Sequence, residues 1–272
     1  MRTKRRTVFD IISVILFVMI SLIMLIPIYK VLVDSFDLKT AYGMRLLPQQ
    51  FGLDGYISVF TNPTLFQPFL ISCVTTIAGT FAGLAISTLG AYVLIQWKMP
   101  GRKLLANFLL FTMIFNGGMI PTYLVMKALG LTNTLWVVIL LPAINVYNLV
   151  LMRNFFEGIP ASLFESAEID GCSPMGTFFK IVLPIMKPTY LSVGILETMW
   201  VWNDYLLPYL TLDSTKYKTI PILIQYFRGG YGHVELGPMM ACIMMVVIPI
   251  VIMYIFCQKY IIDGVVAGAV KG

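Results

Sequence analysis

Residues 162–184 read SLFESAEIDGCSPMGTFFKIVLP, a polar stretch with turn signals in an otherwise apolar chain. The segments on either side of it, 135–152 and 188–208, are each long and apolar enough to cross a membrane. A chain buried in lipid has few reasons to hold such a loop in water, and contact with a soluble partner is the strongest of these reasons. The stretch therefore predicts a membrane protein with a projecting docking loop.

The loop is expected to fold as a helix, a turn and a second helix. Ser162 and Glu165 have the spacing of a capping box, which predicts a helix of about two turns with Ser162 as its cap. Gly171 is expected to end this helix in the left-handed conformation. The second helix is expected to begin with Ser173 as its cap and to lead straight into segment 188–208. A push on the first helix would then reach a membrane span through one stiff element.

The composition of the rest of the chain is that of an all-α integral membrane protein. Of its 272 residues, 58% are hydrophobic and 12% are charged, whereas about a quarter are charged in an ordinary soluble domain. The net charge of +6 is small and its Lys and Arg residues lie at segment ends, so no nucleic-acid partner is expected. Six segments are predicted to span the membrane: 11–33, 68–95, 104–126, 135–152, 188–208 and 238–257.

The placement of Lys and Arg residues beside these segments predicts the orientation. Of the 19 Lys and Arg residues, twelve fall on one side and seven on the other, and the richer side is cytoplasmic. Both termini and the loop 153–187 are therefore expected in the cytoplasm. Segment 11–33 is interpreted as a retained helix and not as a cleaved signal peptide, because its apolar run is longer than a signal core.

Polar residues inside the spans indicate a hydrated route through the bundle, because such groups are costly in lipid unless they face a cavity, a partner or one another. Alternatively, Asn145 and Asn148 are hydrogen-bond contacts between helices, and Glu197 packs against a polar group of a neighbouring helix. The candidate residues of a substrate pathway are Asn116, Asn145, Asn148, Glu197, Asn203 and Asp204.

Small residues recur at four-residue intervals in segment 68–95, at Gly79, Gly83 and Ser87. This interval lets helix backbones approach closely where lipid supplies no hydrophobic driving force. The segment is predicted to pack against other helices of the same chain, in preference to forming a dimer interface.

The loop resembles that of a known protein family. Glu165-Ser166-Ala167-x-x-Asp170-Gly171, followed by Ile181-x-Leu183-Pro184, resembles the Glu-Ala-Ala loop of bacterial ABC importer permeases. The sequence departs from that pattern at Ser166 and Cys172, where alanine is usual. The ending 263–272, DGVVAGAVKG, resembles the tail of the shorter permease subunit in the maltose-importer family. The stretches 117–123, GGMIPTY, and 202–208, WNDYLLP, are similar to segments of permeases for oligosaccharides or polysaccharide fragments.

The resemblance implies a six-span type I ABC importer transmembrane domain that translocates a carbohydrate, most simply an oligosaccharide, across the bacterial cytoplasmic membrane. Its implied partners are a cytoplasmic ABC ATPase dimer, a second homologous permease subunit and an extracellular solute-binding protein. The tail residues Lys271 and Gly272 are implied to contact the ATPase. The residues implied to couple the permease to the ATPase are Glu165, Ser166, Ala167, Asp170, Gly171, Leu183 and Pro184.

The expected organisation is a leader with the first span and first extracellular loop (1–67), a five-span core that contains the loop 153–187 (68–258), and a tail (259–272). The sequence has no Gly-x-x-x-x-Gly-Lys-Ser/Thr motif, so ATP hydrolysis is expected in a separate subunit and this chain is expected to be non-catalytic. A single histidine and four cysteines without close pairing predict no metal, no cofactor and no disulfide framework.

Two other functions remain open from the residues. A membrane-embedded enzyme acting on lipid or glycan could use Glu197 and Asp204 as an acid–base pair, since seven residues of helix separate them by about 10 Å. An ion-coupled transporter would need a buried ionisable group at the midplane, and Glu197 is the candidate.

Overall fold

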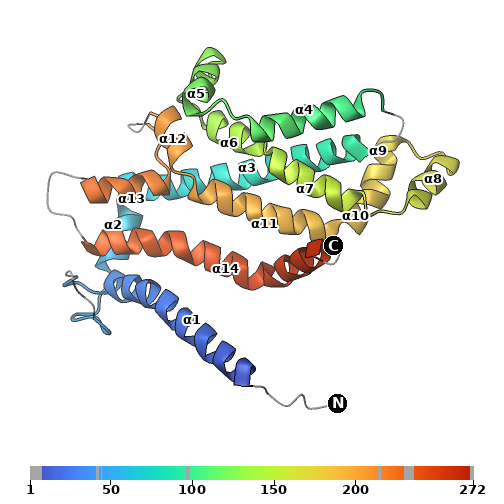
Figure 1. Ribbon diagram of the computed structural model, residues 1–272. Helices are drawn as coiled ribbons and strands as arrows, with labels where there is room; N and C mark the ends of the chain where they lie inside the picture. Colours follow the sequence, from blue (N-terminus) through green and yellow to red (C-terminus); the bar gives the residue numbers. More distant parts are fainter. Residues whose placement is uncertain are drawn as a thin grey trace. The chain divides into compact units, whose positions relative to one another are not determined.

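The structure is a computed structural model that describes residues 8–40, 43, 45–95, 99–213, 216–229 and 236–269 (Figure 1). Among these residues the secondary structure is helical, and the only β-type pairing is an isolated bridge between Asp37 and Phe51. The prediction of an all-α fold is therefore confirmed.

The chain divides into two compact units. The first contains Met1–Phe66 and Leu223–Ile248, and the second contains Gln67–Ile222 and Pro249–Gly272. Three helices, α3 (Pro63–Ile95), α13 (Ile220–Gly229) and α14 (Leu236–Ala269), contain residues of both units. Each unit is described by itself below.

The first unit contains α1 (Val8–Ser35) and α2 (Asp54–Thr61). The loop between these helices is organised by Asp37, which is 5% exposed and accepts hydrogen bonds from the backbone N–H groups of Lys39, Gln49 and Gln50 at 3.0–3.1 Å. Burial alone would raise the pKa of the Asp37 carboxyl, but these N–H groups and the charge of Arg45 outweigh it and hold the pKa below its ordinary value.

The second unit contains most of the helices that follow α2. The helix α3 begins in the first unit and runs on through the second. The elements are α3 (Pro63–Ile95), α4 (Arg102–Ile114), α5 (Met119–Ala128), α6 (Leu135–Ala143), α7 (Val146–Phe156), α8 (Ala161–Ile169), α9 (Pro174–Thr177), a π-helical turn (Phe178–Val182), α10 (Leu183–Ile185), α11 (Lys187–Asn203) and α12 (Leu206–Thr211).

Four helical stretches of the described residues are long and apolar enough to cross a membrane, and the number rises to six if each of two bent helix pairs is one span. Segment 104–126, predicted as one span, is broken into two helices, because α4 and α5 meet at 118°. Asn116 to Gly118 form the break, and Gly118 has a φ of +87°, which favours glycine. Segment 188–208 is also interrupted, because α11 ends at Asn203 before α12 begins.

The small residues of α3 allow close packing within the second unit, as predicted. A Cβ atom placed on Gly79 would lie 3.4 Å from Val201 of α11, and one on Gly83 would lie 2.9 Å from the Glu197 carboxylate. Ser87 is 1% exposed, and the hydroxyl groups of Thr80 and Thr198 are hydrogen-bonded at 3.2 Å. A polar seam therefore joins α3 to α11 inside the chain.

Candidate functional site

The projecting helix α8 begins earlier than the sequence indicated. Its N-cap is Pro160, with a φ of −57°, and no side chain caps it. Ser162 lies inside the first turn, so its predicted role as the cap was wrong. The reason is that Pro160, with a ψ of 133°, already has the extended backbone of a cap, and the helix begins at the next residue, so that Ser162 lies within it.

The end of α8 confirms the predicted glycine. Gly171 has a φ of +74°, its N–H donates to the carbonyl of Glu168 (3.1 Å), and the N–H of Cys172 donates to the carbonyl of Ala167 (2.9 Å). This pair of bonds is a Schellman motif, which satisfies carbonyl groups that the helix end leaves free. Asp170, the C-cap, and Gly171 are exposed, so this turn is fixed by its own backbone and not by burial.

The second half of the loop begins as predicted but is not stiff. Ser173 caps α9 by accepting a hydrogen bond from the N–H of Gly176 at 3.1 Å, with Pro174 at the first helical position. The chain then passes through the π-helical turn and bends by 80° around Met186 before α11 begins. The prediction that one stiff element joins the loop to the span was therefore wrong.

The base of the loop is packed against the bundle instead. The hydroxyl group of Tyr92, in α3, donates to the carbonyl of Pro174 at 2.7 Å. The ring of Tyr92 lies 5.0 Å from that of Phe178, centroid to centroid. Met152 and Phe156 of α7 belong to the same buried cluster, and the side chains of Phe164 and Leu183 pack against it. The loop is thus held by α3 and α7.

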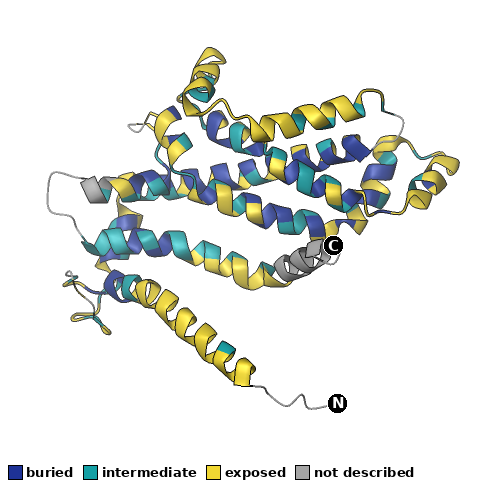
Figure 2. Cartoon of the chain, in the orientation of Figure 1, coloured by how far each residue is buried: buried dark blue, intermediate teal, exposed yellow. Residues whose placement is uncertain are grey.

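The residues predicted to couple to an ATPase divide into two sets. Ala167 is 2% exposed, and Leu183 is half-buried. The others, Glu165, Ser166, Asp170, Gly171 and Pro184, are exposed. Figure 2 shows α8 mostly in the colour of exposed residues. Sequence reasoning missed Ile169, whose side chain is 85% exposed at the end of α8.

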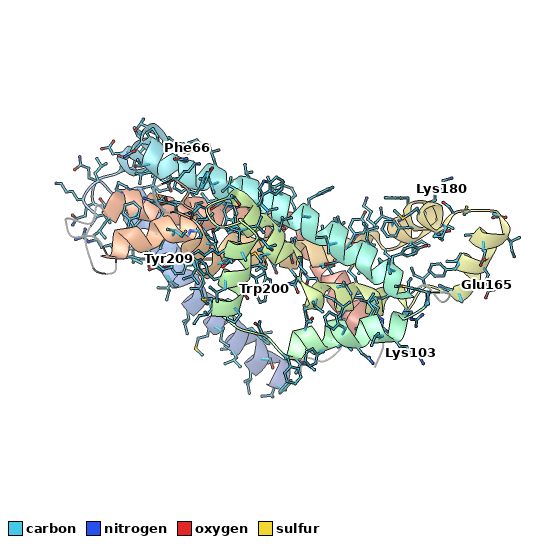
Figure 3. All side chains as sticks on the ribbon, turned by 90° about the horizontal axis from the view of Figure 1, so that it is seen from above. Phe66, Lys103, Glu165, Lys180, Trp200 and Tyr209 are labelled. Atoms are coloured by element: carbon cyan, nitrogen blue, oxygen red, sulfur yellow. The ribbon has the colours of Figure 1, made fainter. Side chains whose placement is uncertain are left out.

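The loop and the pocket described below lie toward different ends of the second unit. Figure 3 shows Lys103, Glu165 and Lys180 at one end of it and Tyr209 at the other. Lys103 and Lys180 are two of the twelve Lys and Arg residues that the sequence places on the side of the loop 153–187.

Two candidate pathway residues, Asn148 and Glu197, are bonded to each other in the interior. The amide of Asn148 donates to the Glu197 carboxylate, and their residues are 4% and 1% exposed. The second carboxylate oxygen, Oε1, is buried without a hydrogen-bond partner. This is the interhelical arrangement that the sequence left as an alternative, and it joins α7 to α11.

Two further candidates make local contacts. Asn145 caps α7, and its side chain accepts hydrogen bonds from the N–H groups of Tyr147 (3.0 Å) and Asn148 (3.3 Å). The amide of Asn203 donates to the carbonyl of Met199 in its own helix at 2.8 Å. These contacts account for the two side chains without a substrate.

The remaining two candidates, Asn116 and Asp204, line one open pocket of about 590 Å³. The pocket lies between α5, the ends of α6 and α11, and α12. Thr122, Tyr123 and Trp200 share its wall. Glu197 does not line it, so the acid–base pair of Glu197 and Asp204 that an enzyme would need does not face a common pocket.

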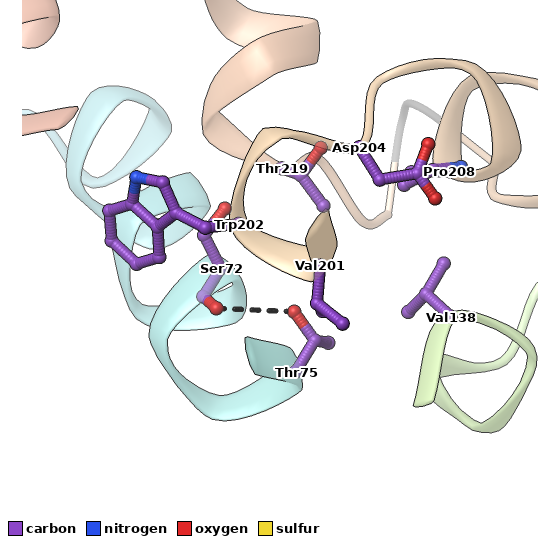
Figure 4. Close-up of a pocket in the computed structure, with 8 residues that line it drawn as sticks. All are labelled: Ser72, Thr75, Val138, Val201, Trp202, Asp204, Pro208 and Thr219. Carbon is purple, nitrogen blue, oxygen red and sulfur yellow. Dashed lines mark hydrogen bonds between the residues drawn. The ribbon is translucent and has the colours of Figure 1, made fainter. Parts of the chain in front are cut away.

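Asp204 also borders a second, much smaller cavity of about 10 Å³, close to the size of one water molecule. Figure 4 shows this cavity with the side chains of Ser72, Thr75 and Thr219 around it. The hydroxyl group of Thr219 has no hydrogen-bond partner there, and the N–H of Ile220 donates to the hydroxyl of Ser72 at 2.9 Å.

The predicted tail contacts, Lys271 and Gly272, lie outside the described residues. Within the part of the chain that the structure describes, no three His, Cys, Asp or Glu side chains are grouped closely enough to hold a metal ion.

The described residues form a helical fold with four apolar spans, or up to six if each bent pair is one span, and this is the fold of a membrane-embedded protein. The chain belongs to the family described as "Binding-protein-dependent transport system inner membrane component", whose model matches residues 2–264. It is therefore a permease subunit of the ABC importer type and a multi-pass protein of the cytoplasmic membrane.

Named relatives and a solved structure are similar over nearly the whole chain. The polygalacturonan/rhamnogalacturonan transport system permease protein YtcP of Bacillus subtilis is 36% identical, over 98% of this chain and 100% of that protein. A probable starch degradation products transport system permease protein, AmyC of Thermoanaerobacterium thermosulfurigenes, is 32% identical, over 93% and 94%. The structure of a bacterial ABC transporter involved in the import of the acidic polysaccharide alginate has a chain with a TM-score of 0.87 and 26% identity, over 96% and 99%.

Proposed function

We propose that this chain is the translocation subunit of an ATP-driven carbohydrate importer and that α8 is its coupling helix. An oligosaccharide is the favoured substrate class, because the relatives at 36% and 32% identity are named for polysaccharide-derived substrates. The observation that carries the coupling role is the exposed end of α8, where a rigid Schellman turn presents Ile169 beside Asp170 and Gly171.

A partner that covered Ile169, which is 85% exposed on a helix outside the bundle, would remove its apolar surface from water and so gain binding free energy. Glu165 and Ser166 on the same helix are exposed too and add polar contacts at the rim of such an interface. Ala167, by contrast, packs inward and keeps α8 close to the base of the loop. This division suits a helix held on one face by the permease and on the other by an ATPase.

The coupling movement passes from α8 to the packed base of the loop and from there to α3 and α7. The 80° bend at Met186 makes a direct push along α11 ineffective. Tyr92 and Phe178 connect the loop to α3 through one hydrogen bond and one ring contact. A displacement of the loop would therefore tilt α3 and α7, and these helices would alternate between inward-open and outward-open arrangements.

The proposal includes a cytoplasmic ABC ATPase dimer, a second homologous permease subunit and an extracellular solute-binding protein. The family description, which makes transport dependent on a binding protein, supports the solute-binding protein, and the resemblance of the loop to that of ABC importer permeases supports the other two partners. The excess of Lys and Arg on the side of the loop supports cytoplasmic termini and a cytoplasmic α8. We assign no catalytic step to this chain, since Glu197 is bonded to Asn148 in the interior and is not exposed to a substrate.

The test compares Ile169→Ser with Met175→Ser in the assembled complex. Met175 is 52% exposed and lies beyond the turn, in α9, so it controls for loss of an exposed apolar side chain. We expect Ile169→Ser to weaken retention of the ATPase roughly tenfold or more, given about 1.5–3 kcal/mol for burial of such a side chain.

The measurements are copurification of the ATPase in detergent and ATP hydrolysis stimulated by sugar-loaded binding protein. Met175→Ser should retain both. Normal copurification and stimulation of the Ile169→Ser complex would refute the docking role of α8.

A further inference from the structure

The pocket of about 590 Å³ between α5 and α12 has the size of a small-molecule site, for which about 300–1,000 Å³ is usual. We propose that it binds one neutral, hydroxyl-rich sugar unit of the transported oligosaccharide and that Asp204 excludes an acidic unit from the same position. This inference rests on the proposed carbohydrate substrate and adds where this subunit contacts it and what it selects.

The polar groups of the wall suit hydroxyl groups. The side-chain oxygen of Asn116 accepts a hydrogen bond from the N–H of Gly118 at 2.8 Å, which orients its NH₂ group to donate elsewhere. The hydroxyl of Thr122 donates to the carbonyl of Gly118 at 2.9 Å and keeps its capacity to accept. Fixed donors and acceptors of this kind match sugar hydroxyls that must replace their bonds to water.

Asp204 supplies the strongest acceptor of the pocket. The Leu207 N–H donates to its Oδ1 atom at 3.3 Å, which fixes the side chain at the start of α12. A carboxylate offers about four acceptor positions, so Asp204 can also accept from neighbouring hydroxyls of one sugar ring. Hydrogen bonds of this charged type are stronger than neutral ones.

Trp200 supplies an apolar surface in the same wall. Its side chain is 73% exposed, in contrast to Trp202, which is 7% exposed and packs edge-to-face on Phe69. A flat aromatic face beside donors and acceptors can cover the C–H face of a sugar ring while the polar groups bind its edge. An aromatic belt at the membrane interface would explain the exposure of Trp200, but not its position beside Asp204 in one pocket.

The charge of the wall determines the selectivity. Among the residues that line the pocket, Asp204 is the only carboxyl group, and there is no Lys, Arg or His. A sugar carboxylate placed here would face a like charge without a compensating cation. The site therefore favours a neutral unit, even if other units of the same oligosaccharide are acidic and bind elsewhere.

The test uses Leu210→Cys, a pocket-lining position, in the full complex with its partner permease and ATPase. The rate of maleimide labelling at residue 210 is measured by peptide mass spectrometry, with maltotriose as the neutral probe and trigalacturonate as the acidic probe. We expect maltotriose to slow labelling and trigalacturonate to leave the rate unchanged.

Three second-site changes sharpen the result. Trp200→Ala should weaken protection by maltotriose roughly tenfold or more, whereas Trp136→Ala, at a tryptophan that is 61% exposed outside the pocket, should not. Asp204→Asn keeps an acceptor at the start of α12 and removes the charge, so it should allow trigalacturonate to protect the site.

Absence of protection by maltotriose, or equal protection in the Trp200→Ala and Trp136→Ala proteins, would overturn the sugar site. Protection by trigalacturonate without Asp204→Asn would overturn the charge selection. ATP-dependent sugar uptake by the same complex reports the proposed importer function separately. Uptake with no protection refutes only the pocket, and a complex that takes up no oligosaccharide with ATP refutes the importer.

Discussion

Replacing Gly83 with alanine should destabilise the protein, whereas the same change one turn away at Gly79 should not. A Cβ atom at Gly83 would lie 2.9 Å from Oε1, 3.1 Å from Cδ and 3.3 Å from Cγ of Glu197. At Gly79 the nearest atom, Cγ1 of Val201, is 3.4 Å away, which is an ordinary van der Waals contact. Both residues are in the interior of α3, so the two changes share their effect on helix propensity.

The magnitudes separate the two variants. Alanine gains about 0.8–1.0 kcal/mol over glycine in a helix interior at either position. At Gly83 overpacking costs about 1–3 kcal/mol, and displacement of the carboxylate weakens its bond to Asn148, about 0.6 kcal/mol for an average bond between membrane helices. The net loss at Gly83 is therefore about 0.6–2.8 kcal/mol, while Gly79→Ala should be neutral or stabilising.

The measurement is thermal unfolding of the detergent-purified complex, followed by tryptophan fluorescence. Since about 1 kcal/mol shifts the midpoint by about 2–4 °C at this size, the Gly83→Ala midpoint should lie below that of Gly79→Ala by about 1 °C or more. The Gly83→Ala penalty should also shrink in a Glu197→Ala background, because the clash partner is then absent. Equal midpoints for the two variants, or a penalty unchanged by Glu197→Ala, would refute the reasoning.

Two further outcomes are expected. The folded-state pKa of Asp37 lies below its ordinary value of 3.8, so its carboxylate stabilises the loop fully above that pH, and this contribution is lost as the pH falls through the lowered pKa. Amide exchange at Gln49 and Gln50, normalised for intrinsic rates, should accelerate as the pH falls through that range. The Asp37→Asn protein should show faster exchange at these two residues already at neutral pH. Asn145→Ala should lower the free energy of unfolding by about 0.5–2 kcal/mol because α7 loses its cap, with Asn145→Asp close to wild type; an unfolding curve unchanged by Asn145→Ala would contradict the capping role.

The sequence was informative where composition alone decides the structure. Runs of about 20 apolar residues predict spans whatever their neighbours do, and this was enough for the all-α fold, while the predicted six spans are the upper value that the described helices allow. The turn at Gly171 and the cap at Ser173 were also predictable, because each depends on chemistry within a few residues.

The angles of the bends were not predictable, because hydropathy has no angular content. The helices α4 and α5 meet at 118° at the break formed by Asn116 to Gly118, and the second bend is 80° at Met186. Asn145 was expected to line a pathway or to bond a neighbouring helix, and its role as the cap of α7 was not predicted. Ser162 shows the opposite failure, since a matching local motif was overridden by the neighbouring Pro160.

For the candidate site, residue type identified polar groups but not their partners. Glu197 and Asp204 are separated by seven residues in the sequence, yet Glu197 is bonded to Asn148 in the interior while Asp204 lines the open pocket. The difference arises because α11 ends between them, at Asn203, so a helical wheel that continues to Asp204 does not apply. Ile169 was missed because a single exposed isoleucine is unremarkable in a sequence and gains meaning only from its position on a projecting helix.

The helix α3 contacts the loop at one point and forms one side of the polar seam at another. Tyr92 contacts the loop at Pro174, and Gly83 contacts Glu197 nine residues earlier in the same helix, about 14 Å along its axis. A helix transmits a tilt over this distance with little internal deformation, because its backbone hydrogen bonds are satisfied within it. The seam can respond to such a tilt without breaking a packed apolar core. The carboxylate of Glu197 faces Gly83, which has no side chain, and the Oε1 atom of Glu197 has no hydrogen-bond partner. Movement of α8 therefore has a physical route to the contact between α3 and α11 that does not depend on the bend at Met186.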